Sequence, residues 1–406
     1  MKLLTFTQFD NKKSSLNDLV SLLFLRYNEQ VSKQALDQRF CEKSVLFLKL
    51  LVEKFLKEIL PEESKLEQFQ HFTTVRIKDS TCFQVPKEFV DVYPGSGGSA
   101  SKAQIRIQFE YDFKSGKVFD LSLHAFNTQD QTNSIETLHN INKNDLLIRD
   151  LGYVNIKYLS QIILIGAYYL NRPSSNITIS EKKGDGDFQE LDFCKIRKEM
   201  KKNGIGIMEK EVYLSKSKCV KTRLVIELLP EKEANERIRK AKKAAKKKKM
   251  KLSKKFIDRS FLNLFITNIP SELVEAKKIR QLYRIRWQIE IIFKTWKSFS
   301  QLHKTKSMKI DRFNTNLYAK LLLILMNWRI LWESYSWYWE SQGVFVSLIK
   351  FYKQLVSQQH EIRICLEYGR NKLAKELCKL LSMPKAMVEL EKKKGKLSLI
   401  ELMLMN

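Results

Sequence analysis

The sequence predicts a mixed α/β fold with helical regions at both ends. Apolar residues recur three and four positions apart in the first 70 residues and after residue 273, as in amphipathic helices. Residues 71–172 instead contain strands of period two that alternate with helices. A third observation is a β-rich stretch, 173–272, that includes a run of lysines. The 406 residues are enough for two or three domains with a sizeable core.

The first 70 residues are predicted to be a helical DNA-binding region. Ser15 and Asp18 can cap a first helix through LNDLVSLLFL. A second helix is expected after Ser32, and a third before Pro61. Two helices joined by a short turn fit a helix-turn-helix, and a plain helical bundle is the alternative. Its candidate DNA contacts are Lys33, Gln34, Gln38 and Arg39.

Two aspartates follow predicted strands in residues 71–172. The strand TTVRIK ends at Asp79, and the short buried-type strand in DLLIRD ends at Asp150. Between them, AQIRIQFEYDF and KVFDLSLHAF form a hairpin around KSGK, and a helix is expected near 134–142. A helix through NIKYLSQIIL and the strand AYYLNR complete this region. Neighbouring strand ends can bring the two carboxylates together, although they are far apart in the sequence.

The stretch LYRIRWQIEIIFKTWKS, from Leu282 to Ser298, is predicted to be one helix with two special faces. At ~100° per residue, one face is an apolar core face made of Leu282, Ile285, Ile289, Ile292, Phe293 and Trp296. The other face carries Tyr283, Arg286, Trp287, Glu290, Lys294 and Lys297. A solvated face does not need Trp or Tyr, so this second face is predicted to contact a ligand. The plainer reading makes Glu290 an ion-pair partner of Arg286 and Lys294.

The sequence is predicted to divide into five regions. One of them is a β-rich insertion, in which GIMEKEVYLSK and KTRLVIELLP are expected to pair as a hairpin and FLNLFITNIP is a further strand. The regions are a helical N-terminal region (1–70), a first part of the core (71–172), a β-rich insertion with a Lys-rich arm (173–272), a final part of the core with the acidic helix (273–330) and a helical C-terminal region (331–406).

Charge indicates the class of partner. The net charge is +28 and the pI is about 9.7, an excess that indicates a polyanion, most often nucleic acid. An anionic membrane surface is the second interpretation. The run from Arg237 to Lys255 holds twelve Lys and Arg residues and no acid, so we expect a phosphate-contacting or a solvated arm. No signal peptide or apolar span of ~20 residues is recognisable, which predicts a cytoplasmic, nucleoid-associated protein without a membrane partner.

Any metal site is expected to consist of carboxylates. The six cysteines and five histidines are scattered and include no C-x-x-C pair, which argues against a His/Cys site. Asp79, Asp150 and Glu290 offer three hard oxygen ligands, a set that suits Mg²⁺ or Mn²⁺. Two such ions ~4 Å apart activate an attacking oxygen and stabilise a leaving one in phosphodiester chemistry. Cations beside Glu290 would then hold a DNA backbone, and the aromatic rings would meet exposed bases.

Four spaced residues and two acidic motifs resemble one known family. The spacing Tyr283-x2-Arg286-x3-Glu290-x6-Lys297 matches the Y-R-E-K signature of bacterial insertion-sequence DDE transposases, in particular the group named insertion-sequence family four. KDST around Asp79 and RDLGY around Asp150 are similar to the first and second acidic motifs of that family. YYLNR and FITNIP resemble the segments that bracket its β insertion. The resemblance is good between residues 70 and 300 and loose at the termini.

This resemblance implies a ribonuclease H-like core, in which a mixed sheet with flanking helices is interrupted by the insertion. It implies Mg²⁺-dependent cutting and strand transfer of double-stranded DNA, with Mn²⁺ able to substitute. The substrates would be the inverted-repeat ends of an insertion sequence and the target DNA, held by a homodimer in a cut-and-paste reaction. The catalytic and metal-binding residues would be Asp79, Asp150 and Glu290.

The resemblance also assigns DNA contacts on the acidic helix. Tyr283, Arg286 and Lys297 would hold the terminal phosphates. Trp287 would lie near a base that is displaced as a hairpin forms. Lys294 is not part of this signature, and its charge beside Glu290 is what predicts a backbone contact.

Two other functions and three other acids remain open. The chain could be an end-binding but catalytically decayed transposase, which the intact triad argues against. It could also be a ribonuclease H-like nuclease without strand transfer, which the Y-R-E-K spacing argues against. Asp112 and Asp120 flank the hairpin turn and are expected to be solvated, whereas Asp130, in a polar loop, remains a candidate for approaching the site.

Overall fold

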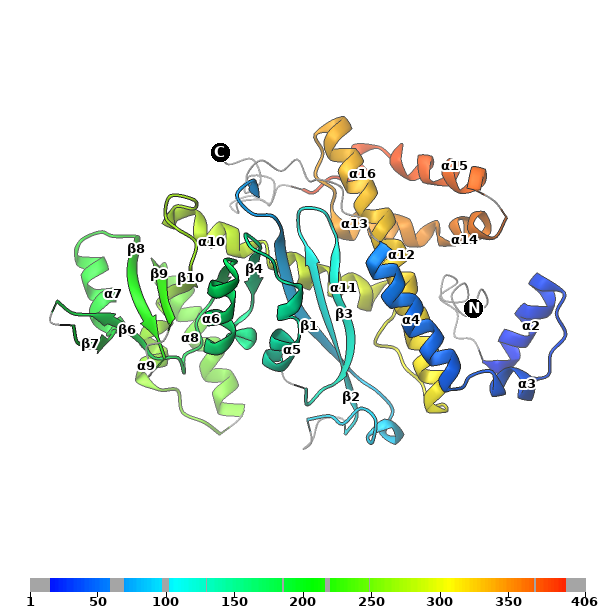
Figure 1. Ribbon diagram of the computed structural model, residues 1–406, viewed down its shortest axis with the longest axis horizontal. Helices are drawn as coiled ribbons and strands as arrows, with labels where there is room; N and C mark the ends of the chain where they lie inside the picture. Colours follow the sequence, from blue (N-terminus) through cyan, green and yellow to red (C-terminus); the bar gives the residue numbers. More distant parts are fainter. Residues whose placement is uncertain are drawn as a thin grey trace. The chain divides into compact units, whose positions relative to one another are not determined.

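The chain forms two compact units (Figure 1). The computed structural model describes residues 15–58, 69–96, 102–128, 130–184, 186–215, 220–247, 249–368 and 370–391. The first unit contains the described parts of Met1–Lys65, Ser80–Thr128 and Trp287–Leu404. The second contains those of Leu66–Asp79 and Gln129–Arg286. These units cut across the five predicted regions, whose functional division stays a prediction.

The second unit is built on a mixed sheet. Its strand order is β1–β4–β5–β10–β9–β8–β6–β7, in which β1, β4 and β5 are parallel and the remaining pairs are antiparallel. Only the first half of β1 belongs to this unit. The strands are β1 (Val75–Gln84), β4 (Leu146–Arg149), β5 (Tyr168–Asn171), β6 (Ile179–Lys182), β7 (Phe188–Glu190), β8 (Ile207–Leu214), β9 (Val220–Leu228) and β10 (Leu262–Thr267).

Helices cover the parallel strands of this unit. All four residues of β4 are buried, as expected for a parallel strand with both faces covered. Asn155 caps α6, and Gly166 ends it in the left-handed conformation at φ +76°. The helices are α5 (Asp130–Glu136), η3 (Leu138–Asn140), η4 (Leu151–Tyr153), α6 (Ile156–Ile165), α7 (Phe193–Lys202), α8 (Glu231–Lys247), α9 (Lys254–Arg259) and α10 (Ala276–Arg284). The helix expected near 134–142 therefore begins earlier and is shorter.

The predicted Lys-rich arm is largely helical. Its first eleven residues, from Arg237 to Lys247, complete α8, and its last two begin α9. Arg237 is anchored in the fold, because its guanidinium donates to the Leu262 carbonyl at 3.1 Å and to Asn263 Oδ1 at 2.8 Å. Lys255 forms an ion pair with Glu190. Phosphate contact by this run stays a prediction. Its exposed lysines include Lys242, Lys243, Lys246 and Lys247 on the outer face of α8.

The first unit contains the predicted hairpin and most of the helices. β2 (Gln104–Asp112) and β3 (Val118–Ala125) pair antiparallel. The strand order here is β3–β2–β1, and the second half of β1 belongs to this unit. Gly116 in the turn has φ +73°, and a Cβ there would lie 2.3 Å from the Trp332 ring. The Trp328 indole donates to the Gly116 carbonyl at 2.8 Å. Glycine is therefore required both by the backbone and by the close approach of a tryptophan.

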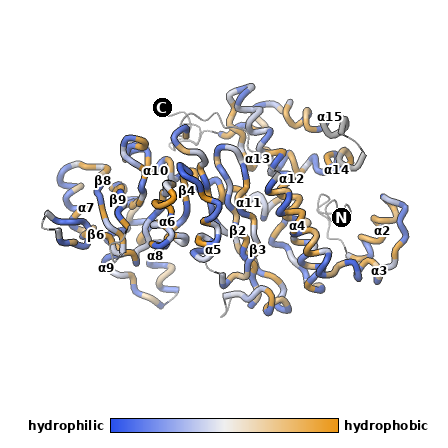
Figure 2. The backbone as a smooth tube through the Cα atoms, in the orientation of Figure 1, coloured by the Kyte–Doolittle hydropathy of each residue, from blue (hydrophilic) through white to orange (hydrophobic). Residues whose placement is uncertain are grey.

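A long helix organises the rest of this unit. α12 (Ile310–Gln342) packs against α4, and Figure 2 shows apolar residues along both. At the N-terminal end, Ser15 and Asp18 form the predicted capping box. The other helices are α2 (Leu16–Tyr27), α3 (Lys33–Gln38), α4 (Glu42–Glu58), η2 (Lys87–Phe89), α11 (Trp287–Ser298), α13 (Leu348–Ser357), α14 (Gln359–Tyr368), α15 (Arg370–Leu381) and α16 (Lys385–Val388). No helix of the described part is long and apolar enough to cross a bilayer.

Candidate active site

Two aspartates lie side by side on parallel strands of the second unit. The β1–β4 register pairs Lys78 with Arg149, so the next positions, Asp79 and Asp150, are neighbours. Parallel strands are about 4.8 Å apart, and paired residues point to the same face. Asp150 follows β4 as predicted, but Asp79 does not end its strand, because β1 continues to Gln84. Both aspartates lie one position past the last residue pair of the β1–β4 ladder.

Two residues near the end of α10, a tyrosine and an arginine, each hold one of these carboxylates. The Tyr283 hydroxyl at the end of α10 donates to Asp150 Oδ1 at 3.3 Å, and Arg286 forms a 2.9 Å ion pair with Asp79 Oδ2. Burial raises the pKa of Tyr283 well above its ordinary value, and the Asp150 charge raises it further. The phenol therefore stays protonated and remains a donor. The Y-x-x-R spacing thus positions both acids, a role that the sequence did not suggest.

Buried cations line the opposite face of these strands. Lys78, next to Asp79, donates to Thr137 Oγ1 at 3.2 Å, and Arg149, next to Asp150, donates to Ser134 Oγ at 2.9 Å. The Arg149 guanidinium also lies 4.7 Å from the centre of the Tyr158 ring. Both cations are essentially inaccessible to solvent. They anchor the parts of β1 and β4 that lie next to the aspartates.

Arg172 is a basic residue at the same edge of the sheet as Asp150. The sequence motifs did not point to it. The β4–β5 register pairs Arg149 with Asn171, which places Arg172 beside Asp150. Its charge, like that of Arg286, opposes the rise in the pKa of Tyr283, a rise caused mainly by burial. A usable signal was present in the sequence, because Arg172 follows β5 as Asp150 follows β4.

The third predicted acid, Glu290, lies on α11 in the first unit. The predicted helix from Leu282 to Ser298 is in fact two helices, because Ile285 and Arg286 form a turn between α10 and α11. The predicted apolar face is buried throughout, but Tyr283 and Arg286 are buried too. The exposed face is therefore confined to α11.

Packing in the first unit holds α11 and leaves its polar face accessible. Trp296 lies 4.8 Å from Phe109 of β2, ring centre to ring centre. Lys297 Nζ donates to the Cys82 carbonyl of β1 at 3.3 Å. Trp287 is 55% exposed, Lys294 is exposed and Glu290 is half-buried. Trp287, Glu290, Lys294 and Lys297 thus come together on one helix, whereas Asp79, Asp150, Tyr283 and Arg286 come together in the second unit.

The competing acids have other roles. Asp112 and Asp120 are buried, contrary to the expectation that they are solvated. Asp112 caps the hairpin turn, accepting from the Ser115 hydroxyl at 2.6 Å and from the Lys114 amide at 3.1 Å. Asp130 begins α5, and its Oδ2 lies 3.7 Å from where a Cβ of Gly152 would be. Asp130 is thus the additional acid close to the segment that follows Asp150.

The aspartate pair has the chemistry of a site for a hard divalent cation. Mg²⁺ is usually held by one or two carboxylates, with waters and substrate phosphates as its other ligands. Asp79 and Asp150 supply such a pair, already oriented by Arg286 and Tyr283. Within the described residues, no three acids, histidines or cysteines converge on one metal position. The described cysteines are all free, and Cys219 lies outside the described residues.

Comparison with known proteins identifies the family. The family described as "Transposase DDE domain" matches residues 70–326, more than half of the chain. The chain belongs to the DDE transposase family. This DDE transposase is 35% identical to the transposase for insertion sequence element IS231B of Bacillus thuringiensis subsp. berliner, over 77% of the chain and 68% of the relative. It is 31% identical to the transposase for IS1151 of Clostridium perfringens, over 84% of the chain and 75% of the relative.

One solved structure also aligns with most of the chain. It is a piggyBac transposase synaptic complex with hairpin DNA. The alignment covers 94% of this chain and 76% of the piggyBac chain, with a TM-score of 0.46 and 12% sequence identity. That score is too low to add to the assignment. The family match and the mixed sheet confirm the predicted ribonuclease H-like class. They also confirm the predicted enzyme class, since a DDE transposase cleaves DNA and transfers its strands. Enzymes of this family generally depend on divalent metal ions.

Proposed function

We propose that this transposase cuts the ends of its own insertion sequence and joins them to target DNA in a cut-and-paste reaction. The observation that carries the proposal is the register of β1 and β4, which sets Asp79 beside Asp150. Tyr283 at the end of α10 and Arg286 in the turn that follows hold these two acids. That turn leads directly into the helix of Glu290. The four Y-R-E-K residues thus follow one another along one stretch of chain, and we propose that this stretch carries catalytic groups.

Asp79, Asp150 and Glu290 are the proposed ligands of Mg²⁺, for which Mn²⁺ can substitute. When bound, the divalent ions activate the attacking oxygen and stabilise the leaving oxygen. In cleavage, a water oxygen bonds to the phosphorus and the bond to the 3′ oxygen breaks. In strand transfer, the new 3′-hydroxyl attacks a target phosphate and displaces another 3′ oxygen. Tyr283 and Arg286 orient the first two carboxylates throughout.

The proposed DNA contacts come from both groups of residues. Lys294 and Lys297 hold backbone phosphates beside Glu290, and Arg172 extends the positive surface beside Asp150. Tyr283 and Arg286 would also meet the terminal phosphates, as the family resemblance implies. The exposed residues Lys33, Gln34 and Gln38 of α3, together with Arg39 at its C-cap, remain the proposed contacts to end sequences. A homodimer that holds two ends, working next to the bacterial nucleoid, completes the proposal.

The test uses the inverted repeats that flank the gene. Purified protein is incubated in Mg²⁺ with labelled duplexes of these repeats and a target plasmid. We expect nicking at the repeat boundary and joining of the labelled strand to the plasmid. Cleavage without joining would instead support the nuclease, and binding without cleavage would support a decayed enzyme. Both alternatives predict no labelled plasmid.

We expect Trp287→Ala to slow the step after the first nick, with little loss of stability. Its indole is 55% exposed beside the catalytic face, so it is available to stack on a base pulled from the duplex. Such stacking contributes roughly 1–3 kcal/mol, about a fivefold change or more. A time course on labelled end DNA separates nicked from fully cleaved product, and a thermal melt follows stability.

Two other tryptophans serve as controls for that experiment. Trp337→Ala, also on a partly exposed residue, should leave both steps unchanged. Trp296→Ala removes a core ring that is 1% exposed. This variant should lose about 3–5 kcal/mol of stability and, with it, both cleavage steps. A Trp287→Ala variant that behaves like Trp296→Ala would show that Trp287 is structural.

We expect the outer face of α8 to supply general affinity for DNA. Changing Lys242, Lys243, Lys246 and Lys247, all exposed, to glutamine should flatten the plot of log affinity against log salt. The slope should change by about 0.9 for each lysine that contacts a phosphate. The cleavage position should not move. Arg237→Gln is the contrasting variant, since it removes bonds inside the fold and should lower stability instead. An unaltered slope in the lysine variant would show that the exposed face of α8 contacts solvent and does not contact DNA phosphates.

A further inference from the structure

An acidic residue on α3 joins this helix to the start of α12 within the first unit. Asp37 Oδ2 accepts from Lys309 Nζ at 2.6 Å, and its Oδ1 accepts from Arg312 Nη1 at 3.3 Å. The hydrogen bond from Lys309 holds the pKa of Asp37 below its ordinary value, so the carboxylate stays charged at neutral pH. One carboxylate therefore binds two cations of a single helical turn. Nothing in the cleavage chemistry uses this contact.

The start of α12 explains why a carboxylate binds there. Lys309 is the N-cap residue of this helix and its side chain forms no capping hydrogen bond, while Arg312 lies in the first turn. The dipole of a helix is positive at its N-terminal end, so cations at this end are unfavourable unless acids lie nearby. Asp311 of α12 supplies one negative charge, and Asp37 supplies another from a different helix. α3 is thereby attached at a defined point of α12.

The sides of α3 have separate tasks. Leu36 of this helix and Phe40 just after it pack with Leu19 of α2 in a small apolar cluster. Asp37, which is 18% exposed, faces the start of α12. The exposed polar side carries the proposed contacts to end sequences, which are Lys33, Gln34, Gln38 and Arg39. Asp37 can thus control the orientation of that side without being part of it.

The loop between α11 and α12 extends this attachment to the helix of Glu290. Lys320 of α12 donates to the carbonyls of Gln301 at 3.3 Å and Lys304 at 3.2 Å. The amide of Leu302, a fully buried residue, donates to the Trp296 carbonyl of α11 at 3.3 Å. The loop is held from both helices, so the start of α12 has a fixed position relative to the end of α11.

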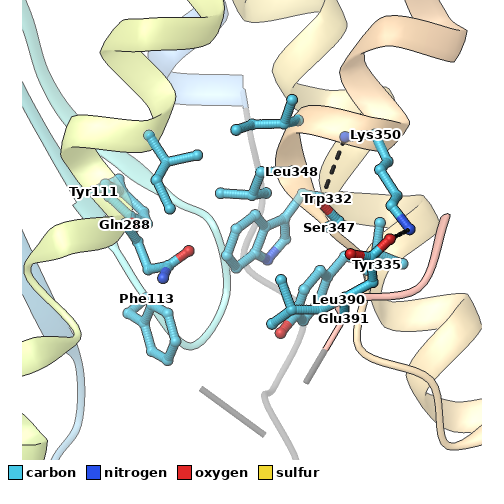
Figure 3. A pocket seen from close by; sticks show the side chains of 13 residues that line it. Tyr111, Phe113, Gln288, Trp332, Tyr335, Ser347, Leu348, Lys350, Leu390 and Glu391 are labelled. Atoms are coloured by element: carbon cyan, nitrogen blue, oxygen red, sulfur yellow. Dashed lines mark hydrogen bonds and ion pairs between the residues drawn. The ribbon is translucent and has the colours of Figure 1, made fainter. Parts of the chain in front are cut away.

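One side of α11 near Glu290 is less closely packed. Gln288 and Ile291, which flank Glu290 in the sequence, border a cavity of about 210 Å³. Figure 3 shows Gln288 on one side of this cavity and Trp332 of α12 on the other. A cavity lacks the contacts that would fix the helix from this side. The connection through the loop therefore has more influence on where Glu290 lies.

We propose that Asp37 is a positioning residue that sets the cleavage site, because it holds α3 at a fixed distance from the helix that carries Glu290. The proposal rests on the proposed function, in which α3 contacts the end sequence and Glu290 binds metal. Neighbouring nucleotides lie about 3.4 Å apart along a strand, so a movement of α3 by that distance moves the cut by one nucleotide. Asp37 itself contacts neither the DNA nor the metal ions.

The test follows cleavage of labelled repeat-end duplexes in Mg²⁺, with products resolved to one nucleotide. Asp37→Asn removes the charge. A triple variant, Asp37→Lys with Lys309→Glu and Arg312→Glu, reverses all three charges and restores the attraction. Asp18→Asn is the matched control, because it removes an acid that caps α2 in the same part of the chain. Fluorescence anisotropy measures affinity for the repeat, and thermal melting measures stability.

Loss of a partly exposed ion pair changes an equilibrium by at most about fivefold. In Asp37→Asn we therefore expect cuts away from the repeat boundary to become up to about fivefold more frequent, with affinity and melting temperature nearly unchanged. The reversed variant and Asp18→Asn should cut at the wild-type position.

An unchanged cleavage position in Asp37→Asn, with or without a lower melting temperature, would overturn the inference. So would a reversed variant that melts like the wild type but still cuts at the wrong positions. If the wild type itself does not cut at the repeat boundary, the proposed function fails, and this inference fails with it.

Discussion

We expect Glu290→Gln to abolish cleavage of end DNA and to leave DNA binding and stability nearly unchanged. The amide is a poor ligand for a hard divalent cation, and loss of several kcal/mol of charge stabilisation corresponds to a rate lower by roughly 10³-fold or more. Stability should hold because α11 is anchored by other side chains, such as Ile289 and Trp296. Nicking of labelled end DNA in Mg²⁺, with anisotropy and thermal melts in parallel, measures all three quantities.

Glu333→Gln is the matched control for this substitution. Glu333 is an exposed glutamate of the first unit that pairs with Arg329 on the same helix. Its neutralisation should leave cleavage near the wild-type rate. Near wild-type nicking by Glu290→Gln would remove Glu290 from the proposed set of ligands.

Asp79→Asn should abolish cleavage and lower stability as well. Arg286 is 8% exposed, so removal of the Asp79 charge leaves a buried guanidinium without its ion pair. Loss of the charged partner of a buried group costs about 1–3 kcal/mol, and the 20% exposure of Asp79 places the value toward the lower end. Asp150→Asn should also abolish cleavage but destabilise less, because its partner Tyr283 is an uncharged phenol. Urea unfolding measures the stability of each variant.

A double variant separates the two roles of Asp79. Asp79→Asn combined with Arg286→Met replaces the ion pair by groups without charge, so stability should recover while cleavage stays absent. Nicking by this double variant would show that Asp79 is not a metal ligand. A single Asp79→Asn variant as stable as the wild type would show that the ion pair does not support the fold.

Local sequence signals were sufficient for most of the fold. The capping residues Ser15 and Asp18, the KSGK turn and the strand around Leu146 lie where their patterns place them. The break between α10 and α11 was not predictable, because the apolar period continues through Ile285 without Gly or Pro. Tertiary packing turns the chain there, and Ile285 is fully buried in the turn.

The neighbourhood of two predicted acids, Asp79 and Asp150, was predictable from the sequence, but the groups that hold them were not. The motifs around Asp79 and Asp150 indicated that strand ends meet, and the β1–β4 register places them together. The pairing of Arg286 with Asp79 depends on where a distant turn packs, which no local pattern encodes. The burial of Asp112 was not predicted. Its carboxylate accepts hydrogen bonds from backbone amides of the turn, and these replace the water that an exposed carboxylate would bind.

Binding of Mn²⁺ to the complex with end DNA tests the central claim most directly. The claim is that Asp79, Asp150 and Glu290 together hold the divalent ion. Electron paramagnetic resonance of free Mn²⁺ gives the affinity for the wild type, for Asp79→Asn, Asp150→Asn and Glu290→Gln, and for Asp130→Asn as the control acid beside η4. Loss of an outer partner of a metal ligand already costs 10–100-fold, so each of the three variants should bind at least about tenfold more weakly, and Asp130→Asn should bind like the wild type. Wild-type affinity in Glu290→Gln, or an equal loss in Asp130→Asn, would contradict the assignment.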